Sequence, residues 1–330
     1  MTPGPRNTIA DVDGLRVGQA SDDRLRTGVT VVVGPGRMMA AVHVVGGAPG
    51  SRETDLLAPE MAADGVDAFV LSGGSAFGLD AAAGVAECLR AEGRGVEIGP
   101  HIIPIVPAAI VFDLDAARGE TWTEGPWRRL GVEALASAND RVALGTVGAG
   151  TGATTATLKG GVGSASAVVD GITVGAFVVA NPIGSVTVGD GRHFWAAPFE
   201  EGREFGGFGP AMAPEDRPPT KTEARAGAAT VIGLVATDLA LTKPQAKRLA
   251  MMAHDGIARA VVPAHTPFDG DLVFAASTGV RHADNPDLSL IGIGHAAATC
   301  LARSIARAVY LAGPRPGDTH PAWREKFGSA

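Results

Sequence analysis

Two apolar, β-branched runs joined by a tight-turn signal constrain the fold more than any other feature of this chain. Residues 164–169 and 173–179 are each typical of a buried strand, and Asp170-Gly171 between them favours a hairpin turn. A hairpin makes its two strands antiparallel, so this part of the sheet is not built from parallel crossover units. Other strands also come in such pairs, with long helices between them. We therefore expect an α+β fold of layered sheets and helices, not a doubly wound parallel sheet.

The remaining elements follow from the period of the apolar residues. Further strands are predicted at 8–18 (a short strand and a turn), 29–33, 39–45, 66–71, 106–112, 231–235 and 271–276. Helices are predicted after the turn at 72–78 as far as Leu89, and over 243–262 and 290–311. Gly34-Pro35-Gly36 predicts a turn between two of the strands. The polar, Pro-rich stretch 185–229 is expected to be a surface excursion within a single domain spanning 1–330.

Composition narrows the possible partners. Hydrophobic residues make up 45% of the chain and aromatic residues only 5%, with 46 glycines, so the core has to be built mainly from Ala, Val, Ile and Leu. The net charge of −7 argues against binding to nucleic acid. Cys88 and Cys300 lie far apart in Ala-rich helical patterns, which favours buried thiols over a disulfide. Without a leader or a membrane-length apolar run, we expect a cytoplasmic protein that does not bind membranes.

The glycine-rich segment 145–163 does not match either common phosphate-binding loop. Lys159 is preceded by Leu and followed by Gly, which excludes a Walker motif, and the segment leads into a strand instead of the helix that a dinucleotide fingerprint requires. Glycines such as Gly150 and Gly160 instead let the backbone approach a substrate and offer N–H donors to an oxyanion. The eight histidines show no metal-ligand spacing, so we expect neither a metal nor a cofactor.

Thr230 opens the apolar run 230–238 directly after the polar stretch. A β-branched residue at the start of a strand is common and needs no further explanation. A threonine at the point where a loop enters a buried strand can also attack the peptide bond that precedes it. The cut would make Thr230 a new N-terminus, with its hydroxyl as nucleophile and its own α-amine as the adjacent base.

Two other segments carry candidate polar groups. Asp269 and Asp271 flank a glycine just before a predicted strand, where they could form an Asx turn or orient a nucleophile; the further acidic ligands of a calcium loop are missing. Asn181 closes a buried strand in Asn-Pro-Ile-Gly, where its amide could serve a plain turn or donate to an oxyanion.

Six segments in one order over the chain resemble a known family: 46–54, 71–78, 104–109, 158–163, 231–238 and 267–271. The family is that of the self-processing aminopeptidases, which includes L-aminopeptidase/D-Ala-esterase/amidase, the β-peptidyl aminopeptidases and the nylon-oligomer hydrolases. The resemblance implies a four-layer αββα sandwich similar to that of ornithine acetyltransferase. It also implies a precursor that cuts itself before a Ser or Thr.

The resemblance places that cut between Ala229 and Thr230, giving chains 1–229 and 230–330. The Thr230 hydroxyl would attack the Ala229 carbonyl, and water would open the resulting ester. Ala229 stands where nylon hydrolases have an Asn, and other relatives carry a small Gly at this position.

The remaining site residues are also implied by the resemblance. Asn181 would stabilise the oxyanion together with N–H groups of the glycine loop, and Lys159 would add positive charge near the same oxygen or lower the pKa of the Thr230 amine. Asp269 and Asp271 would hold the Thr230 hydroxyl and amine. Phe112 replaces a pocket tyrosine of the nylon hydrolases and, with Gly150 and Gly160, is expected to line the substrate pocket.

The expected activity is that of an aminopeptidase or amidase acting on small peptides or amino-acid amides. An endo-acting hydrolase of 6-aminohexanoate (nylon) oligomers and an acyltransferase to amines are alternatives within the same chemistry. Ala229 keeps open a different class, an uncleaved relative that only binds a ligand or assembles. Relatives form homo-oligomers, often tetramers, and the resemblance implies the same here.

Overall fold

The hairpin at Asp170-Gly171 forms as predicted: β8 (Gly161–Val169) pairs antiparallel with β9 (Ile172–Asn181). The computed structural model describes residues 1–330 except 118, 213–217, 222–228 and 329–330. The other strands are β1 (Arg16–Asp22), β2 (Thr27–Val44), β3 (Ser51–Arg52), β4 (Val66–Ser72), β5 (Val96–Ile98), β6 (His101–Ile103), β7 (Ala108–Ile110), β10 (Thr230–Leu239) and β11 (Leu272–Arg281).

The helices are α1 (Ala81–Ala91), α2 (Trp127–Ala136), α3 (Lys243–Ala253), α4 (Asp255–Ala258), α5 (Pro286–Tyr310) and α6 (Trp323–Phe327). Short 3-10 turns are η1 (Ile9–Asp11), η2 (Asp55–Leu57), η3 (Ser75–Asp80), η4 (Leu114–Ala117), η5 (Gly148–Gly150) and η6 (Ala197–Phe199). The helix predicted over 243–262 therefore divides at His254 and ends at Ala258.

The long strand β2 connects the two sheet layers. Its first half pairs with β1 and β4, its second half pairs with β11, and the register shifts between Val33 and Met38. The strand order is β3-β7-β4-β2-β11-β10-β9-β8, with β1 beside β2. The turn predicted at Gly34-Pro35-Gly36 was wrong: these residues form an irregularity within one continuous strand, which lets β2 leave one layer and enter the other.

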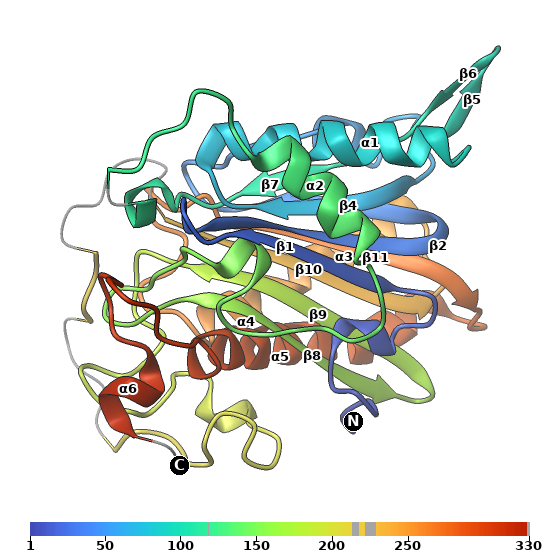
Figure 1. Ribbon diagram of the computed structural model, residues 1–330. Coiled ribbons are helices and arrows are strands. Elements are labelled where there is room, and N and C mark those ends of the chain that lie inside the picture. The colour runs from blue at the N-terminus through green and yellow to red at the C-terminus, as the bar shows by residue number, and fades with distance from the viewer. Residues whose placement is uncertain (118, 213–217, 222–228, 329–330) are drawn as a thin grey trace.

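Separate apolar cores fill the spaces between four layers (Figure 1). Helices α1 and α2 cover the outer face of the sheet layer that contains β4 and the first half of β2. Helices α3 and α5 cover the outer face of the other layer, which contains β8–β11. The central core joins the two sheets, where the rings of Phe69 on β4 and Phe274 on β11 lie 5.3 Å apart. The arrangement is the predicted α+β sandwich with αββα layering.

Strand β10 is buried along its whole length because it is covered on both faces. Val231 and Val235 point into the core beneath α5, while Ile232 and Leu234 point into the core between the sheets. This alternation holds the register of β10 strongly, because a slip of one residue would exchange the two sets of side chains.

The stretch 185–229 is less superficial than predicted. Phe194 and Phe205 are buried in the core beneath α5, and Glu204 forms an ion pair with the buried Arg303 of α5 at 2.5 Å. Charged residues of this kind are buried only when they are paired, so Glu204 anchors the described part of the stretch to the helix.

Helix α5 is a core element. By length and composition alone it could cross a membrane, but 72% of its most apolar window is buried inside the protein. Cys300 on this helix is buried and free, as predicted. Cys88 on α1 is also free, but the prediction that it is buried was wrong, because it is partly exposed.

The contact between α5 and β8 depends on a missing side chain. A Cβ at Gly163 would lie 1.9 Å from the Ser304 carbonyl oxygen. We expect Gly163→Ala to destabilise the fold by about 1–3 kcal/mol through overpacking, seen as a lower Tm. Gly36→Ala, where the added Cβ meets nothing within 4 Å, is the matched control. Equal Tm values for the two variants would contradict this account of the interface.

Candidate active site

Thr230 lies at the first position of β10, between β9 and β11. In the antiparallel pair with β9 it is opposite Asn181, and its side chain is buried, with 2% exposure. The parallel pairing of β10 with β11 begins at Ile232 opposite Leu272, so the loop that enters β11 ends beside Thr230. The sheet register thus brings together three segments that are far apart in the sequence.

The carbonyl before Thr230 receives two hydrogen bonds. The Thr230 hydroxyl donates to the Ala229 carbonyl oxygen at 2.5 Å, and the Gly270 N–H donates to the same oxygen at 2.9 Å. A Cβ at Gly270 would lie 2.7 Å from the Thr230 Oγ1. A hydroxyl therefore lies against this carbonyl, and a backbone N–H is directed at the same oxygen.

Asp271 links the start of β10 to a histidine. Its Oδ1 accepts the Val231 N–H at 2.7 Å, and its Oδ2 accepts the His265 backbone N–H at 3.1 Å and contacts the His265 Nδ1 at 2.8 Å. The carboxylate is buried and holds the residue directly after Thr230. The imidazole and the two N–H groups together compensate a buried carboxylate that would otherwise be costly.

Asp269 joins the loop after β9 to the loop before β11 by hydrogen bonds. Its Oδ1 accepts the Ile183 N–H at 3.0 Å, and its Oδ2 accepts the Thr266 N–H at 3.0 Å and the Thr266 hydroxyl at 2.6 Å. Burial, followed by the neighbouring carboxylate of Asp271, raises the pKa of Asp269. Within the described residues, neither carboxylate bonds the Thr230 hydroxyl in the uncut chain, so their expected roles toward the hydroxyl and the amine stay predictions.

The Asn181 side chain is held on both sides. Its Oδ1 accepts the Thr154 N–H at 3.0 Å and the Lys221 ammonium at 3.1 Å, while its Nδ2 donates to the Phe112 carbonyl oxygen at 3.0 Å. Phe112 therefore reaches the site through its backbone. The glycine-rich loop contributes the Thr154 N–H, which orients Asn181.

The predicted loop glycines act in packing within this structure. The Gly150 N–H donates to Val147 and the Gly160 N–H to Ala153, so both donors are already used by backbone carbonyls. A Cβ at Gly160 would lie 2.1 Å from the Ala180 carbonyl oxygen. Their place in the substrate pocket stays a prediction.

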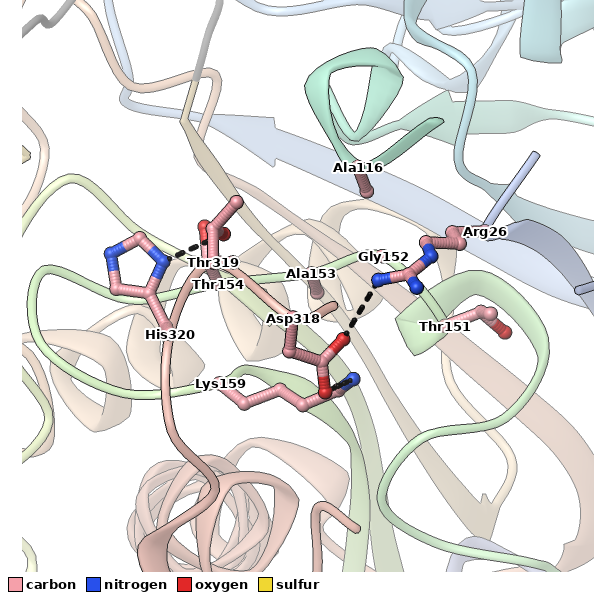
Figure 2. A pocket seen from close by; sticks show the side chains of 10 residues that line it. All are labelled: Arg26, Ala116, Thr151, Gly152, Ala153, Thr154, Lys159, Asp318, Thr319 and His320. Atoms are coloured by element: carbon pink, nitrogen blue, oxygen red, sulfur yellow. Dashed lines mark hydrogen bonds and ion pairs between the residues drawn. The ribbon is translucent and has the colours of Figure 1, made fainter. Parts of the chain in front are cut away.

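Lys159 lines a small neighbouring pocket together with Arg26, Asp318 and His320 (Figure 2). Its ammonium bonds Asp318 at 2.5 Å, and the other oxygen of Asp318 bonds Arg26 at 3.2 Å. Burial lowers the pKa of Lys159, although Asp318 favours its charged form. The structure shows Lys159 on Asp318, and its expected effect on Thr230 stays a prediction.

Two residues at the site were not assigned from the sequence. His265 belongs to the segment that carries Asp269 and Asp271, and its position six residues before Asp271 offered a weak signal. Lys221 lies in the polar stretch, where a lone lysine has no distinguishing pattern. No group of His, Cys, Asp and Glu among the described residues could hold a metal ion.

Asp113 is a buried acid beside this site. Its Oδ1 accepts the Gly74 N–H at 2.7 Å, and its Oδ2 has no partner among the residues that the structure describes. Burial raises the pKa of Asp113 to about 7, although the hydrogen bond from the Gly74 N–H favours the carboxylate.

Comparisons with known proteins agree with the resemblance. The profile of Peptidase family S58 matches residues 7–321. An uncharacterized aminopeptidase of Mycobacterium tuberculosis is 41% identical, with 98% of this chain and 99% of the relative covered. A 6-aminohexanoate-oligomer endohydrolase of Paenarthrobacter ureafaciens is 29% identical, with 81% and 74% covered.

Solved structures agree with the fold. A β-aminopeptidase of Burkholderia sp. superimposes with a TM-score of 0.71 at 23% identity, covering 99% of this chain and 93% of that chain. The L-aminopeptidase D-Ala-esterase/amidase of Ochrobactrum anthropi, described as a variant of the Ntn hydrolase fold, gives 0.71 at 24% identity, covering 97% and 92%. At these identities the likeness concerns the fold alone.

The raised pKa of Asp113 predicts a pH dependence of stability. A carboxyl group whose pKa is higher in the folded chain stabilises it fully below the unfolded value of about 3.9, and this contribution is lost as pH rises to about 7. Asp113→Asn removes the ionisation and keeps an oxygen for Gly74. We expect the Tm of the variant minus that of the wild type to increase from about pH 4 to 7 and then level off.

Asp13→Asn, at an exposed position, serves as the control for replacing an aspartate by an asparagine. Thermal melts across this range measure both variants. A flat difference for Asp113→Asn would show that this carboxyl is ionised in the folded protein throughout.

Proposed function

The chain belongs to peptidase family S58 and is a hydrolase of peptide bonds, and on that premise we propose that Thr230 is its self-generated N-terminal nucleophile. The proposed substrates are small peptides or amino-acid amides. The observation that carries the proposal is the contact of the Thr230 hydroxyl with the Ala229 carbonyl, together with the Gly270 N–H on the same oxygen.

The first step is cleavage of the chain. The Thr230 Oγ1 attacks the Ala229 carbonyl carbon, and the oxygen that gains negative charge keeps the Gly270 N–H as donor. The bond from carbon to the Thr230 nitrogen then breaks, and that nitrogen takes the hydroxyl proton, which leaves an ester and a free amine. Water hydrolyses the ester to a carboxylate on Ala229 and restores the Thr230 hydroxyl.

The second step is hydrolysis of a substrate by the same hydroxyl. The Thr230 α-amine, with an ordinary pKa of about 7.7–8.0, accepts the hydroxyl proton as Oγ1 attacks the substrate carbonyl, and it returns the proton to the departing amine. Water then cleaves the acyl ester. Asp271 supports this geometry through the Val231 N–H, and the Asn181 amide is proposed to donate to the oxyanion.

Ala229 supports cleavage by its size and burial. Its side chain is 1% exposed, and its backbone bridges in parallel to Asp269, so the scissile carbonyl is held in place. A held carbonyl next to its nucleophile gains from proximity and orientation. This observation favours self-processing over the alternative of an uncleaved binding protein.

A second substrate class is favoured by one specific feature. Asn181-Pro182-Ile183-Gly184 matches the Asn-Pro-x-Gly motif of the nylon-oligomer hydrolases, and a 6-aminohexanoate-oligomer endohydrolase is among the relatives. Turnover of a 6-aminohexanoate oligomer at internal bonds, compared with release of single residues from peptides, distinguishes the two substrate classes.

The role of Thr230 predicts a sharp difference between two small substitutions. Thr230→Ala removes the hydroxyl, so we expect an uncut chain and no amide hydrolysis above background, while the folded structure is retained. Thr230→Ser keeps a hydroxyl and should keep both reactions at a reduced rate. Activity on amino-acid p-nitroanilides and dipeptides measures the effect. Amide hydrolysis retained by Thr230→Ala would contradict the proposal that Thr230 is the nucleophile.

The space beside the Thr230 hydroxyl gives a further prediction. A Cβ at Gly270 would crowd both the Thr230 Oγ1 and the Ala48 carbonyl oxygen at 2.7 Å, so Gly270→Ala should displace the nucleophile. A displacement of about 1 Å costs on the order of 10²-fold in rate. The time course of precursor cleavage measures this, with Gly313→Ala, which meets open space, as the control. Cleavage of both variants at the same rate would contradict the prediction that a side chain at position 270 displaces the Thr230 hydroxyl.

A further inference from the structure

The Asn181 side chain carries a cation that no sequence motif indicates. The Lys221 ammonium lies 3.1 Å from the Asn181 Oδ1 and 3.2 Å from the Asn181 carbonyl oxygen. The Lys221 backbone N–H donates to the Ile183 carbonyl oxygen at 2.9 Å. Backbone and side chain of Lys221 therefore both bond the segment from the end of β9 to Ile183, and Lys221 is partly buried there.

These contacts determine the orientation of the amide. Because an ammonium group can only donate, the atom that faces Lys221 has to be the oxygen of Asn181. The Thr154 N–H, which also only donates, faces the same oxygen at 3.0 Å. The amide nitrogen then points to the other side, where one of its two N–H groups donates to the Phe112 carbonyl oxygen. The second N–H has no partner among the described residues.

The cation also strengthens that remaining donor. Hydrogen bonds with a charged partner are roughly twice as strong as neutral ones, and successive hydrogen bonds polarise one another. An ammonium on the Asn181 oxygen withdraws electron density from the amide and makes its N–H groups better donors. Since Asn181 lies opposite Thr230 in the sheet, this donor is at the strand end where the reaction takes place.

We propose that Lys221 is a positioning residue that orients and polarises the Asn181 amide so that its free N–H stabilises the oxyanion formed on attack by Thr230. The inference rests on the proposed function, because it needs the reaction of Thr230. It assigns to Lys221 the positive charge that the resemblance placed on Lys159, whose ammonium is bound by Asp318.

The charges around Lys221 determine how its state varies with pH. Burial lowers the pKa of the Lys221 ammonium to about 7, while the carboxylates of Asp269 and Asp115 favour its charged form. On the other side, the charge of Lys221 contributes to lowering the pKa of His320, which burial lowers most. A Lys221 with such a pKa is partly neutral at pH 7 and neutral at higher pH.

The experiment compares three variants on processed protein. Lys221→Met keeps the length of the side chain and removes the charge, Lys221→Arg keeps a permanent charge, and Lys159→Met removes the neighbouring cation. We expect Lys221→Met to lower kcat about 10-fold or more, since loss of a whole oxyanion donor costs 10²–10³, with KM within about 2-fold. Lys221→Arg should recover most of the wild-type kcat. Lys159→Met should have a higher kcat than Lys221→Met.

The pH profile provides the readout that a merely structural role would not move. In the wild type, kcat should follow a bell-shaped pH profile, because it rises as the Thr230 amine loses its proton and falls as Lys221, with a pKa of about 7, loses its own. In Lys221→Arg, the decline of kcat at high pH should begin more than one pH unit higher, because the arginine stays charged. If Lys221→Met stays uncut, the rate of self-cleavage replaces kcat, and recovery by Lys221→Arg remains the expected result.

Two results would overturn the inference. An unchanged kcat in Lys221→Met would show that the amide needs no cation. A lower KM with a higher kcat/KM would show that Lys221 instead occupies the place of a substrate ammonium and competes with it. Both leave the proposed function intact, which fails only if Thr230→Ala keeps amide hydrolysis or the wild type has none.

Discussion

The register of β10 between β9 and β11 is the constraint on which the site depends. Strand β10 buries alternate side chains in two different cores, so it cannot slip without exchanging both sets. This register places Thr230 opposite Asn181 and brings the loop before β11 alongside the same strand end. The geometry of the sheet therefore brings together the Ala229 carbonyl, the Thr230 hydroxyl and the Gly270 N–H, and the packed layers on either side keep them in place.

Polar groups at this strand end bond one another in a connected set of contacts. Asp271 holds the residue after Thr230, Asp269 joins the loop after β9 to the loop before β11, and Asn181 joins the glycine-rich loop to Phe112. Buried carboxylates and amides are costly without partners, so the same hydrogen bonds that stabilise the site also orient it. If Thr230 acts as proposed, the uncut chain already holds these groups in position, and the new α-amine is what cleavage would add.

Much of this could be predicted from the sequence, for identifiable physical reasons. The Asp170-Gly171 hairpin, the apolar run after Thr230 and the periodic α5 are local signals, and each forms within a few residues of the expected bounds. The continuity of β2 could not be predicted, because a Gly-Pro-Gly sequence suits a turn and an irregular strand equally well. Phe194 and Phe205 looked superficial because the polar residues around them conceal their burial beneath α5. The contacts of Lys159 and Lys221 depend on long-range packing, and a lysine carries no local signal of its partner.

The measurement that tests the central claim most directly is the intact mass of the purified protein, with N-terminal sequencing of any smaller chain. The account predicts two chains, with the smaller beginning Thr230-Val231-Ile232. A single chain of 330 residues that persists on incubation, or a cut with a different N-terminus, would contradict it.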